Sequence, residues 1–326
     1  MSENSAKKEA LKSAKKVKND EFYTLIEDVE KEMIYYRHYF EGKTLLLNCD
    51  DPEQSSFWKY FSLNFDFLGL KGLISTHYVG DKDADEKAYM LRYDTQHGTN
   101  EERVTKRYLK GDGDFRSDEC IELLKEADIV ITNPPFSLWR EFLETIFQYE
   151  KQFLILGNFN AITYAEVYPL IKENKLWLGV TRQGSGSMWF RVPKNAPDKT
   201  GQRFDNLGNK YQTIGNTAWF TNLEHQKRHE EIILTKFYEG NEADYPIYDN
   251  YPAIEVSRIK DLPIDYTGVM GVPITFIGKY NPDQFEIIKF RKGEDDKDLN
   301  YNGKSPFFRI LIKNKKPISK KDVLGF

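Results

Sequence analysis

One stretch constrains the fold of this chain more than any other: an apolar, β-branched run over residues 129–132 that ends in Asn133, Pro134, Pro135 and Phe136. Consecutive apolar residues indicate a strand that is buried on both faces, as in a parallel sheet. The prolines end this strand, because proline lacks the N–H of the ladder and Pro135 restricts Pro134 to an extended conformation. Asn133 is therefore predicted at the carboxyl end of a parallel strand, where open α/β sheets bind ligands.

Strands and helices are predicted to alternate along most of the chain. Apolar runs bounded by turn residues predict strands, and apolar residues at helical spacing predict helices. Such alternation favours an α/β fold with a doubly wound parallel sheet. The further predicted strands cover residues 43–48, 71–79, 152–157 and 175–180, and the predicted helices run through Phe40 and over residues 55–65, 117–125, 137–149 and 163–173.

Two segments depart from this alternation. Residues 80–107 are polar and show little apolar periodicity, so we expect an insertion that contains a hairpin. Residues 181–187 carry an arginine among small residues, so we expect a flexible cationic loop that orders on DNA or stays an exposed connection. The apolar runs at 189–192 and 218–221 are predicted to form a terminal hairpin of the same sheet.

The composition changes again towards the C-terminus. From residue 236 the chain is rich in Tyr, Pro, Asn and Gly, with a clear strand predicted only at 307–312. We therefore expect a smaller, irregular module after the main domain. The predicted division is a flexible basic arm at 1–18, a catalytic domain at 19–235 and a C-terminal module at 236–326.

Charge and cysteine content exclude several classes of protein. The net charge is −4, with lysines gathered near both ends, so we expect basic arms there that contact phosphates or stay solvated. Cys49 and Cys120 are the two cysteines, which predicts no disulfide framework and favours the cytoplasm. No apolar run approaches the roughly 20 residues of a membrane span. His225 and His229 lack a third ligand nearby, so no metal site is predicted.

The residue types that follow the 129–132 strand suit the chemistry of an amine on a planar base. The amide oxygen of Asn133 accepts one hydrogen of such an amine, and the carbonyl of Pro134 accepts the other. Phe136 is placed to stack on the base. The stretch resembles motif IV of the amino-group DNA methyltransferases, in which Asn first and Phe last point to adenine N6. The alternative is a plain strand-ending turn.

Three other stretches fit the same chemistry. Asp50 and Asp51 close the first strand, at a position that faces the polar end of a cofactor in a doubly wound sheet. Asp114 and Phe115 end another segment at the same edge, where a carboxylate accepts from an adenine amine and a ring stacks on it. The segment 20–24 precedes the first helix and is placed to close over a pocket. The alternatives are helix caps for the acidic residues and core positions for the aromatic ones.

Taken together, these motifs resemble the adenine-N6 DNA methyltransferases of the EcoRI modification-methylase type. The resemblance implies a Rossmann-like sheet, S-adenosylmethionine as methyl donor, and transfer to an adenine flipped out of double-stranded DNA, with GAATTC as the target. It also implies a C-terminal recognition module. It rests on residues 20–24, 48–52, 113–117, 128–137, 268–276 and 308–313.

The resemblance assigns roles to particular residues. Asn133, Pro134 and Phe136 would hold the target base. The residues that would contact the cofactor are Phe22, Thr24, Asn48, Cys49, Asp50, Asp51, Asp114 and Phe115. The chain departs from the wider methyltransferase pattern in two places: the first-strand turn lacks glycine, and the second predicted strand ends without the acidic residue that usually binds ribose, for which a residue near Asp81 is the substitute.

Two other classes of function stay open at this stage. The first is methyl transfer to cytosine N4, an RNA base or a protein glutamine, and the second is a DNA-binding relative without catalysis. Asn133 and Phe136 disfavour cytosine, for which Ser and Tyr are more usual in this family. We further expect a monomer that acts either beside a cognate restriction endonuclease, which shares the target without forming a stable complex, or as a solitary modification enzyme.

Overall fold

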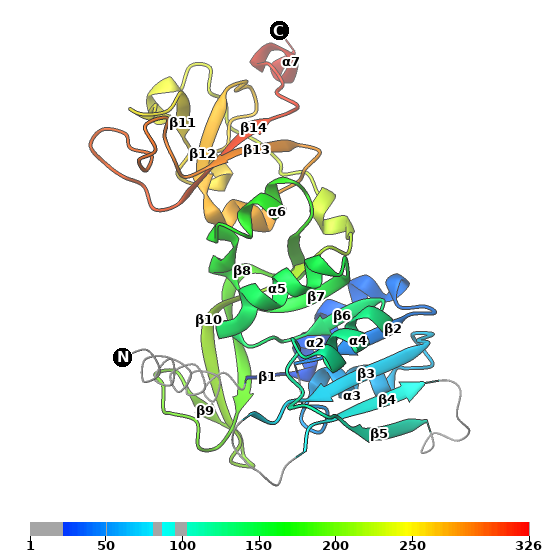
Figure 1. Cartoon of the computed structure of the whole chain (residues 1–326). Helices are drawn as coiled ribbons and strands as arrows, with labels where there is room; N and C mark the ends of the chain where they lie inside the picture. Colours follow the sequence, from blue (N-terminus) through cyan, green and yellow to red (C-terminus); the bar gives the residue numbers. More distant parts are fainter. Residues whose placement is uncertain (1–21, 50, 81–86, 95–102, 326) are drawn as a thin grey trace. The chain divides into compact units, whose positions relative to one another are not determined.

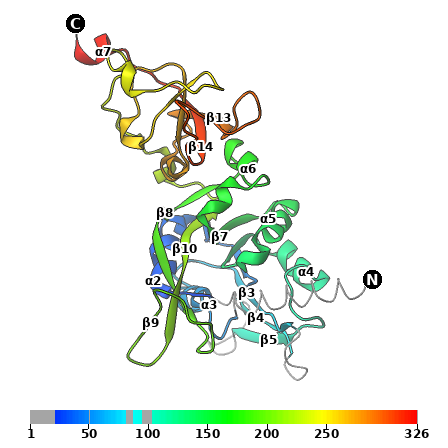
Figure 2. The ribbon, with the colours of Figure 1, turned by 90° about the vertical axis from the view of Figure 1, so that its left-hand side faces the viewer.

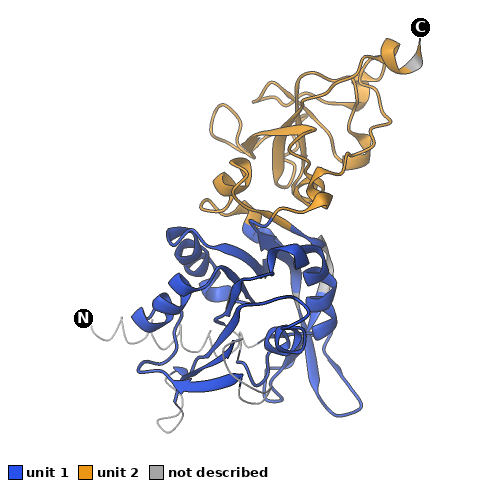
Figure 3. Ribbon diagram, turned by 90° about the vertical axis from the view of Figure 1, so that its right-hand side faces the viewer, with its two compact units in different colours: residues 1–161, 179–223 blue, residues 162–178, 224–326 orange. Residues whose placement is uncertain are grey.

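The fold was analysed in a computed structural model, which describes residues 22–49, 51–80, 87–94 and 103–325. The predicted arm at 1–18, Asp50 and the substitute acid near Asp81 lie outside these residues. The described chain divides into two compact units (Figure 3). Unit 1 contains residues up to 161 together with 179–223, and unit 2 contains residues 162–178 and 224–326.

Unit 1 is built on one large mixed sheet (Figure 1). Its strand order is β1-β8-β10-β7-β6-β2-β3-β4-β5, and β9 pairs with β10. The strands are β1 (Tyr23–Thr24), β2 (Thr44–Leu47), β3 (Gly72–His77), β4 (Tyr89–Asp94), β5 (Val104–Tyr108), β6 (Ile129–Thr132), β7 (Gln152–Asn158), β8 (Trp177–Val192), β9 (Arg203–Phe204) and β10 (Lys210–Thr221).

The centre of this sheet is parallel, as the sequence predicted. The strands β7, β6, β2 and β3 run in the same direction. Outside them the sheet is antiparallel: β4 and β5 add a hairpin at one side, and β10 pairs antiparallel with β7 at the other. The expected hairpin in the 80–107 insertion is thus confirmed. The result is a mixed α/β unit.

Helices cover both faces of the parallel strands (Figure 2). Alternate strand residues such as Leu45, Leu47 and Ile131 pack with Val29 and Phe61 of the helices on one face in a single core cluster. Serine side chains at positions 55 and 117 cap the helices that follow them. The helical segments are α2 (Ile26–Met33), η1 (Ile34–Tyr39), α3 (Ser56–Leu63), α4 (Asp118–Glu126), η3 (Phe136–Leu138), α5 (Trp139–Gln148) and η4 (Phe159–Thr163).

The expected loop at 181–187 is wrong. The backbone there continues β8, which runs without interruption from Trp177 to Val192. β8 lies next to β10 in the sheet, and β1 pairs with β8 only at Phe190 and Arg191. The ladder to β10 therefore outweighs the local preference of glycine and serine for turns.

Unit 2 has a small sheet of its own, in the order β11-β12-β14-β13. It begins earlier than the predicted boundary at 236 and also takes up residues 162–178. Tyr168 stacks on Phe290 with ring centroids 4.8 Å apart, and Lys172 donates to the Ile288 carbonyl at 2.8 Å. The elements are α6 (Tyr168–Lys172), η5 (Gln226–His229), η6 (Glu242–Asp244), β11 (Ala253–Glu255), η7 (Ile259–Asp261), β12 (Val269–Pro273), η8 (Ile274–Lys279), β13 (Phe285–Phe290), β14 (Arg309–Asn314) and α7 (Lys320–Leu324).

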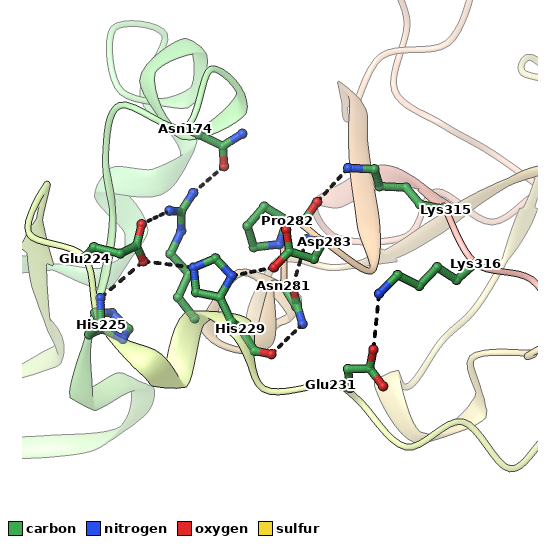
Figure 4. A network of polar contacts seen from close by, with 11 residues as sticks. Asn174, Glu224, His225, His229, Glu231, Asn281, Pro282, Asp283, Lys315 and Lys316 are labelled. Carbon is green, nitrogen blue, oxygen red and sulfur yellow. Dashed lines mark hydrogen bonds and ion pairs between the residues drawn. The ribbon is translucent and has the colours of Figure 1, made fainter.

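A polar network fixes the start of the second part of unit 2 (Figure 4). The guanidinium of Arg228 joins Glu224 at 2.6 Å, and the His229 ring joins Glu224 and Asp283 at 3.2 and 2.5 Å. His225 instead uses its Nε2 on the Leu178 carbonyl, at 2.9 Å. Within the described chain, no group of three or more His, Cys, Asp or Glu side chains is arranged to hold a metal ion. Over the same residues, no helix is long and apolar enough to cross a membrane.

Candidate active site

Asn133 lies directly after β6, at the carboxyl end of the parallel strands, as predicted. Its side chain is buried, with 8% of the residue exposed. The amide Nδ2 donates to the main-chain carbonyl of Phe22 at 2.6 Å. Because only the NH2 group of an amide donates to a carbonyl, this contact also decides where the amide oxygen lies, on the other side of the same planar group.

A second contact ties the end of β6 to the end of β2. The backbone N–H of Cys49 donates to the Thr132 hydroxyl at 3.2 Å. Thr132 is fully buried, and Asn48 is only 5% exposed. The turn that begins at Asn48 therefore lies beside the strand end that carries Asn133, which is the arrangement that the doubly wound topology predicts.

The helix that follows the two prolines is anchored from below. The indole N–H of Trp139, the first residue of α5, donates to the Leu156 carbonyl of β7 at 2.8 Å. Position 157 must be glycine for this approach, because a Cβ there would lie 2.5 Å from the Trp139 Nε1. The turn at Pro134 and Phe136 is thereby held between a buried strand and a fixed helix.

At the neighbouring strand end, Asp51 meets His77, the last residue of β3. The closest approach, between Asp51 Oδ1 and His77 Nδ1, is 3.5 Å. Burial favours the protonated acid, but hydrogen bonds from His77 and the Glu53 backbone outweigh it and lower the pKa of Asp51. The His77 ring also stacks on Tyr89 of β4, with centroids 4.8 Å apart. Asp51 is thus an ionised carboxylate at the sheet edge.

The segment that contains Asp114 packs on the same strand end. Gly113 has φ +83°, and a Cβ at this position would lie 2.4 Å from the His77 carbonyl oxygen. The Asp114 carboxylate is held by the Arg116 guanidinium, with N–O distances of 2.9 and 2.6 Å. These contacts overcome the effect of burial and lower the pKa of Asp114. Phe115 is 5% exposed and packs edge-on against Phe142, so its ring is a core element.

The segment before α2 supplies the remaining predicted residues. Phe22 is half-buried and packs edge-on against Phe190, with ring centroids 6.0 Å apart. Thr24 pairs with Phe190 in the β1–β8 ladder and is 2% exposed. Among the described residues its hydroxyl has no hydrogen-bond partner. A buried hydroxyl without a partner is costly, which is typical of a position that a ligand completes.

An open cavity of about 430 Å³ lies beside this edge. It is lined by the end of the β3 segment at Val79 and Gly80, by residues 87–88 and by residues 108–112. None of the predicted site residues lines it, although Asp112 is two positions from Asp114. Within the described chain it is a neighbouring cavity and not the pocket of Asn133.

Hydrogen bonds and close contacts thus connect most of the predicted site residues in one row, from Phe22 through Asn133 and Cys49 to Asp51 and Asp114. Sequence reasoning missed His77 and Arg116, which hold the two acidic residues. Arg116 follows Asp114 by two positions, and that spacing was a usable signal. The sequence around His77 carried no such signal, because its partner Asp51 follows another strand, β2.

The comparison with protein families agrees with this geometry. A family model described as adenine-specific methyltransferase EcoRI matches residues 10–315. The chain belongs to this family. It is therefore an adenine-specific DNA methyltransferase.

Similar curated proteins cover nearly the whole chain. The Type II methyltransferase M.EcoRI of Escherichia coli is 52% identical over 315 residues, which are 94% of this chain and 96% of the relative. M.MgeORF184P of Mycoplasma genitalium is 40% identical, over 92% of this chain and 97% of its own. M.MpnI of Mycoplasma pneumoniae is 36% identical, over 94% and 98%. No solved structure matches the chain.

Proposed function

We propose that the chain transfers the methyl group of S-adenosylmethionine to N6 of an adenine that is flipped out of duplex DNA. The observation that carries this proposal is the fixed amide of Asn133, which is buried at the end of β6 and held by the Phe22 carbonyl at 2.6 Å. An amide held in this way presents a carbonyl oxygen in one direction only. Such a pre-oriented acceptor lowers the reorganisation needed in the transition state.

The target amine is assigned to two acceptors. The Asn133 oxygen accepts one N–H of the adenine amine, and the Pro134 carbonyl accepts the other. With both hydrogens held, the nitrogen lone pair turns towards the methyl donor as the N–C bond forms and the bond from sulfur to carbon breaks. The methylated amine then loses one proton to water, so a strong general base is not required.

Flipping the base out of the duplex has a cost of a few kcal/mol for unpairing and unstacking. Phe136 is half-buried at the start of η3, so part of its ring is accessible to a base. We assign this ring to stacking on the flipped adenine, which offsets part of the cost. Phe136 and Asn133 would then recognise the face and the edge of the same base.

S-adenosylmethionine fits the residues at the neighbouring strand ends. When bound, it supplies a methyl carbon activated by a positively charged sulfur. The turn at Asn48, Cys49 and Asp51 would hold the polar end of the cofactor. The buried hydroxyl of Thr24 would form a hydrogen bond with the cofactor. Asp114 retains acceptor capacity beyond its Arg116 partner, because a carboxylate has about four lone-pair sites. Phe115 would contribute through packing, not through an exposed ring.

The first test is methyl transfer from tritiated S-adenosylmethionine to duplex DNA, followed by digestion and identification of the labelled nucleoside. We expect N6-methyl-2′-deoxyadenosine. Label on cytosine, RNA or protein glutamine would instead support one of the other methyltransferase classes, and no label with intact DNA binding would support a non-catalytic relative. The Asn133→Ala variant should lose transfer and keep cofactor binding. Loss of cofactor binding in the folded variant would contradict the assignment of Asn133 to the base.

The target sequence that we propose to test first is GAATTC. We place its recognition in the irregular C-terminal module at 236–326, which lies within unit 2. A monomeric enzyme, a separate cognate endonuclease and a cytoplasmic site of action stay predictions of the sequence. Sequencing the modified DNA of a host that expresses the protein tests the target directly, since every methylated adenine is then read in its own context.

A further inference from the structure

The long hairpin of β8 and β10 carries a loop, residues 193–200, that reaches the candidate active site. Figures 1 and 2 show the hairpin extending with β9 beyond β1. In this loop the Lys199 ammonium lies 5.1 Å from the centroid of the Phe22 ring. Phe22 is the residue whose carbonyl holds the Asn133 amide. An exposed cation therefore lies beside the ring of the residue whose carbonyl holds the Asn133 amide.

The loop before Lys199 is held by two side chains that are almost completely buried. Lys210 is 3% exposed, and its ammonium donates to the Ala196 carbonyl at 2.6 Å and to Asp198 at 2.7 Å. Gln212 is 2% exposed, and its amide donates to the Pro197 carbonyl at 2.6 Å. A lysine is rarely buried unless it is paired, because desolvation of its charge is costly. Both β10 side chains therefore serve to fix residues 196–198.

The backbone after these residues is also fixed. The Lys199 N–H donates to the Gln202 side chain at 3.2 Å, and the Gln202 N–H donates to the Lys199 carbonyl at 3.3 Å. Gly201, with φ +83°, allows this tight turn. The position of Lys199 is thus determined on both sides, while its side chain stays exposed to solvent.

The charge of this hairpin differs from that of the whole chain. The chain has a net charge of −4, but residues 191–210 contain five cationic and two anionic residues. One of the anionic residues, Asp198, is neutralised by Lys210. A local positive charge on a protein that is negative overall is typical of a surface that contacts nucleic acid.

We propose that Lys199 binds a backbone phosphate of the flipped nucleotide, and that the loop pinned by Lys210 and Gln212 positions it there. This inference rests on the proposed function. A flipped adenine remains linked to its own phosphates, so these must lie at the mouth of the pocket that holds the base. The contact between the Lys199 ammonium and the Phe22 ring is weak because the lysine is exposed to solvent, so it is readily exchanged for a phosphate.

The test compares Lys199→Ala with Lys194→Ala, which removes another exposed lysine of the same loop. Affinity for a duplex that contains the target is measured by fluorescence anisotropy between 50 and 200 mM salt. Each phosphate contact contributes about 0.9 to the slope of log K against log salt. Over this fourfold range the affinity of the wild type should therefore fall about 3.5-fold more than that of Lys199→Ala. Lys194→Ala should keep the wild-type slope, and Lys199→Arg should restore it.

Two further variants test the role of the pinned loop. Lys210→Met and the milder Gln212→Met should each reduce the salt slope in the same way as Lys199→Ala, and combining either with Lys199→Ala should add little. Limited proteolysis should cut residues 194–202 faster in both variants. Thermal melting and cofactor titration identify a variant that is misfolded. If Lys210→Met is misfolded, the salt slope of Gln212→Met decides whether the loop positions Lys199.

The outcomes separate this inference from the proposed function. If the wild type neither methylates adenine nor binds the duplex, the proposed function fails. If the wild type methylates adenine but the slopes of Lys199→Ala and Lys194→Ala are equal, the phosphate contact is refuted. A weaker affinity for S-adenosylmethionine in Lys199→Ala, with an unchanged salt slope, would also refute it and would place Lys199 at the cofactor.

Discussion

The Asn133→Asp variant tests the hydrogen bond between the Asn133 amide and the Phe22 carbonyl. The substitution keeps the shape of the side chain but replaces the donor Nδ2 with an oxygen. At neutral pH, two acceptor oxygens would then face each other where an N–H···O contact of 2.6 Å now lies. The position is only 8% exposed, so water cannot compensate fully.

The expected loss follows from this burial. Leaving a buried hydrogen-bonding group without its partner costs about 1–3 kcal/mol. If the whole cost appears in the transition state, transfer slows about 5- to 150-fold at neutral pH. The ionised carboxyl is disfavoured there, so its pKa should rise above the usual value of about 3.9. The protonated acid can again donate to Phe22, and activity should therefore recover as the pH falls.

The assay is single-turnover transfer of tritiated methyl to a target duplex between pH 5.5 and 8.5. The decisive quantity is the rate of the variant divided by the rate of the wild type at each pH, since the ratio cancels effects on DNA and cofactor. This ratio should increase as the pH is lowered. A ratio that stays flat across the range, or a wild-type rate at pH 8.5, would show that the Phe22 carbonyl does not orient the amide.

Three other substitutions test separate parts of the structure. Thr24→Val removes a buried hydroxyl without a partner, so the melting temperature should rise slightly. Titration should show the affinity for the cofactor falling about tenfold, and an unchanged affinity would remove Thr24 from the cofactor site. Glu32→Gln should lower the free energy of unfolding by about 1–3 kcal/mol in urea titrations, because the two oxygens of Glu32 accept from four N–H and O–H donors. Glu30→Gln, at an exposed position, is the control, and equal effects of the two substitutions would contradict the reasoning. Gly157→Ala should cost about 1–3 kcal/mol in thermal melts, since its Cβ would displace Trp139; a neutral result would mean that α5 shifts freely.

Local patterns predicted the centre of the catalytic unit well. The β-branched run at 129–132 and the prolines after it fixed both the strand and the position of Asn133, because burial on two faces and the loss of an N–H donor are properties of those residues alone. The same logic held for β2, β3 and β7. These strands lie next to one another, so each local prediction agreed with the fold around it.

Features that depend on distant partners were not predictable in this way. The 181–187 segment carries the residues of a loop, yet it is part of a strand because β8 lies next to β10 in the sheet. Phe115 is 5% exposed with Phe142 packed edge-on against it, and no local pattern indicates that contact. The extent of unit 2 depends on the stacking of Tyr168 on Phe290, which are more than a hundred residues apart in the chain. Such contacts arise from tertiary packing and leave little trace in local sequence.

The group that accepts the hydrogen bond from the Asn133 amide is the main-chain carbonyl of Phe22 and not its side chain. Every amino acid at position 22 has the same carbonyl oxygen, so replacing the ring leaves this hydrogen bond in place. Alanine scanning therefore does not detect the contribution of this hydrogen bond. Backbone chemistry or deletion of the segment would reveal it.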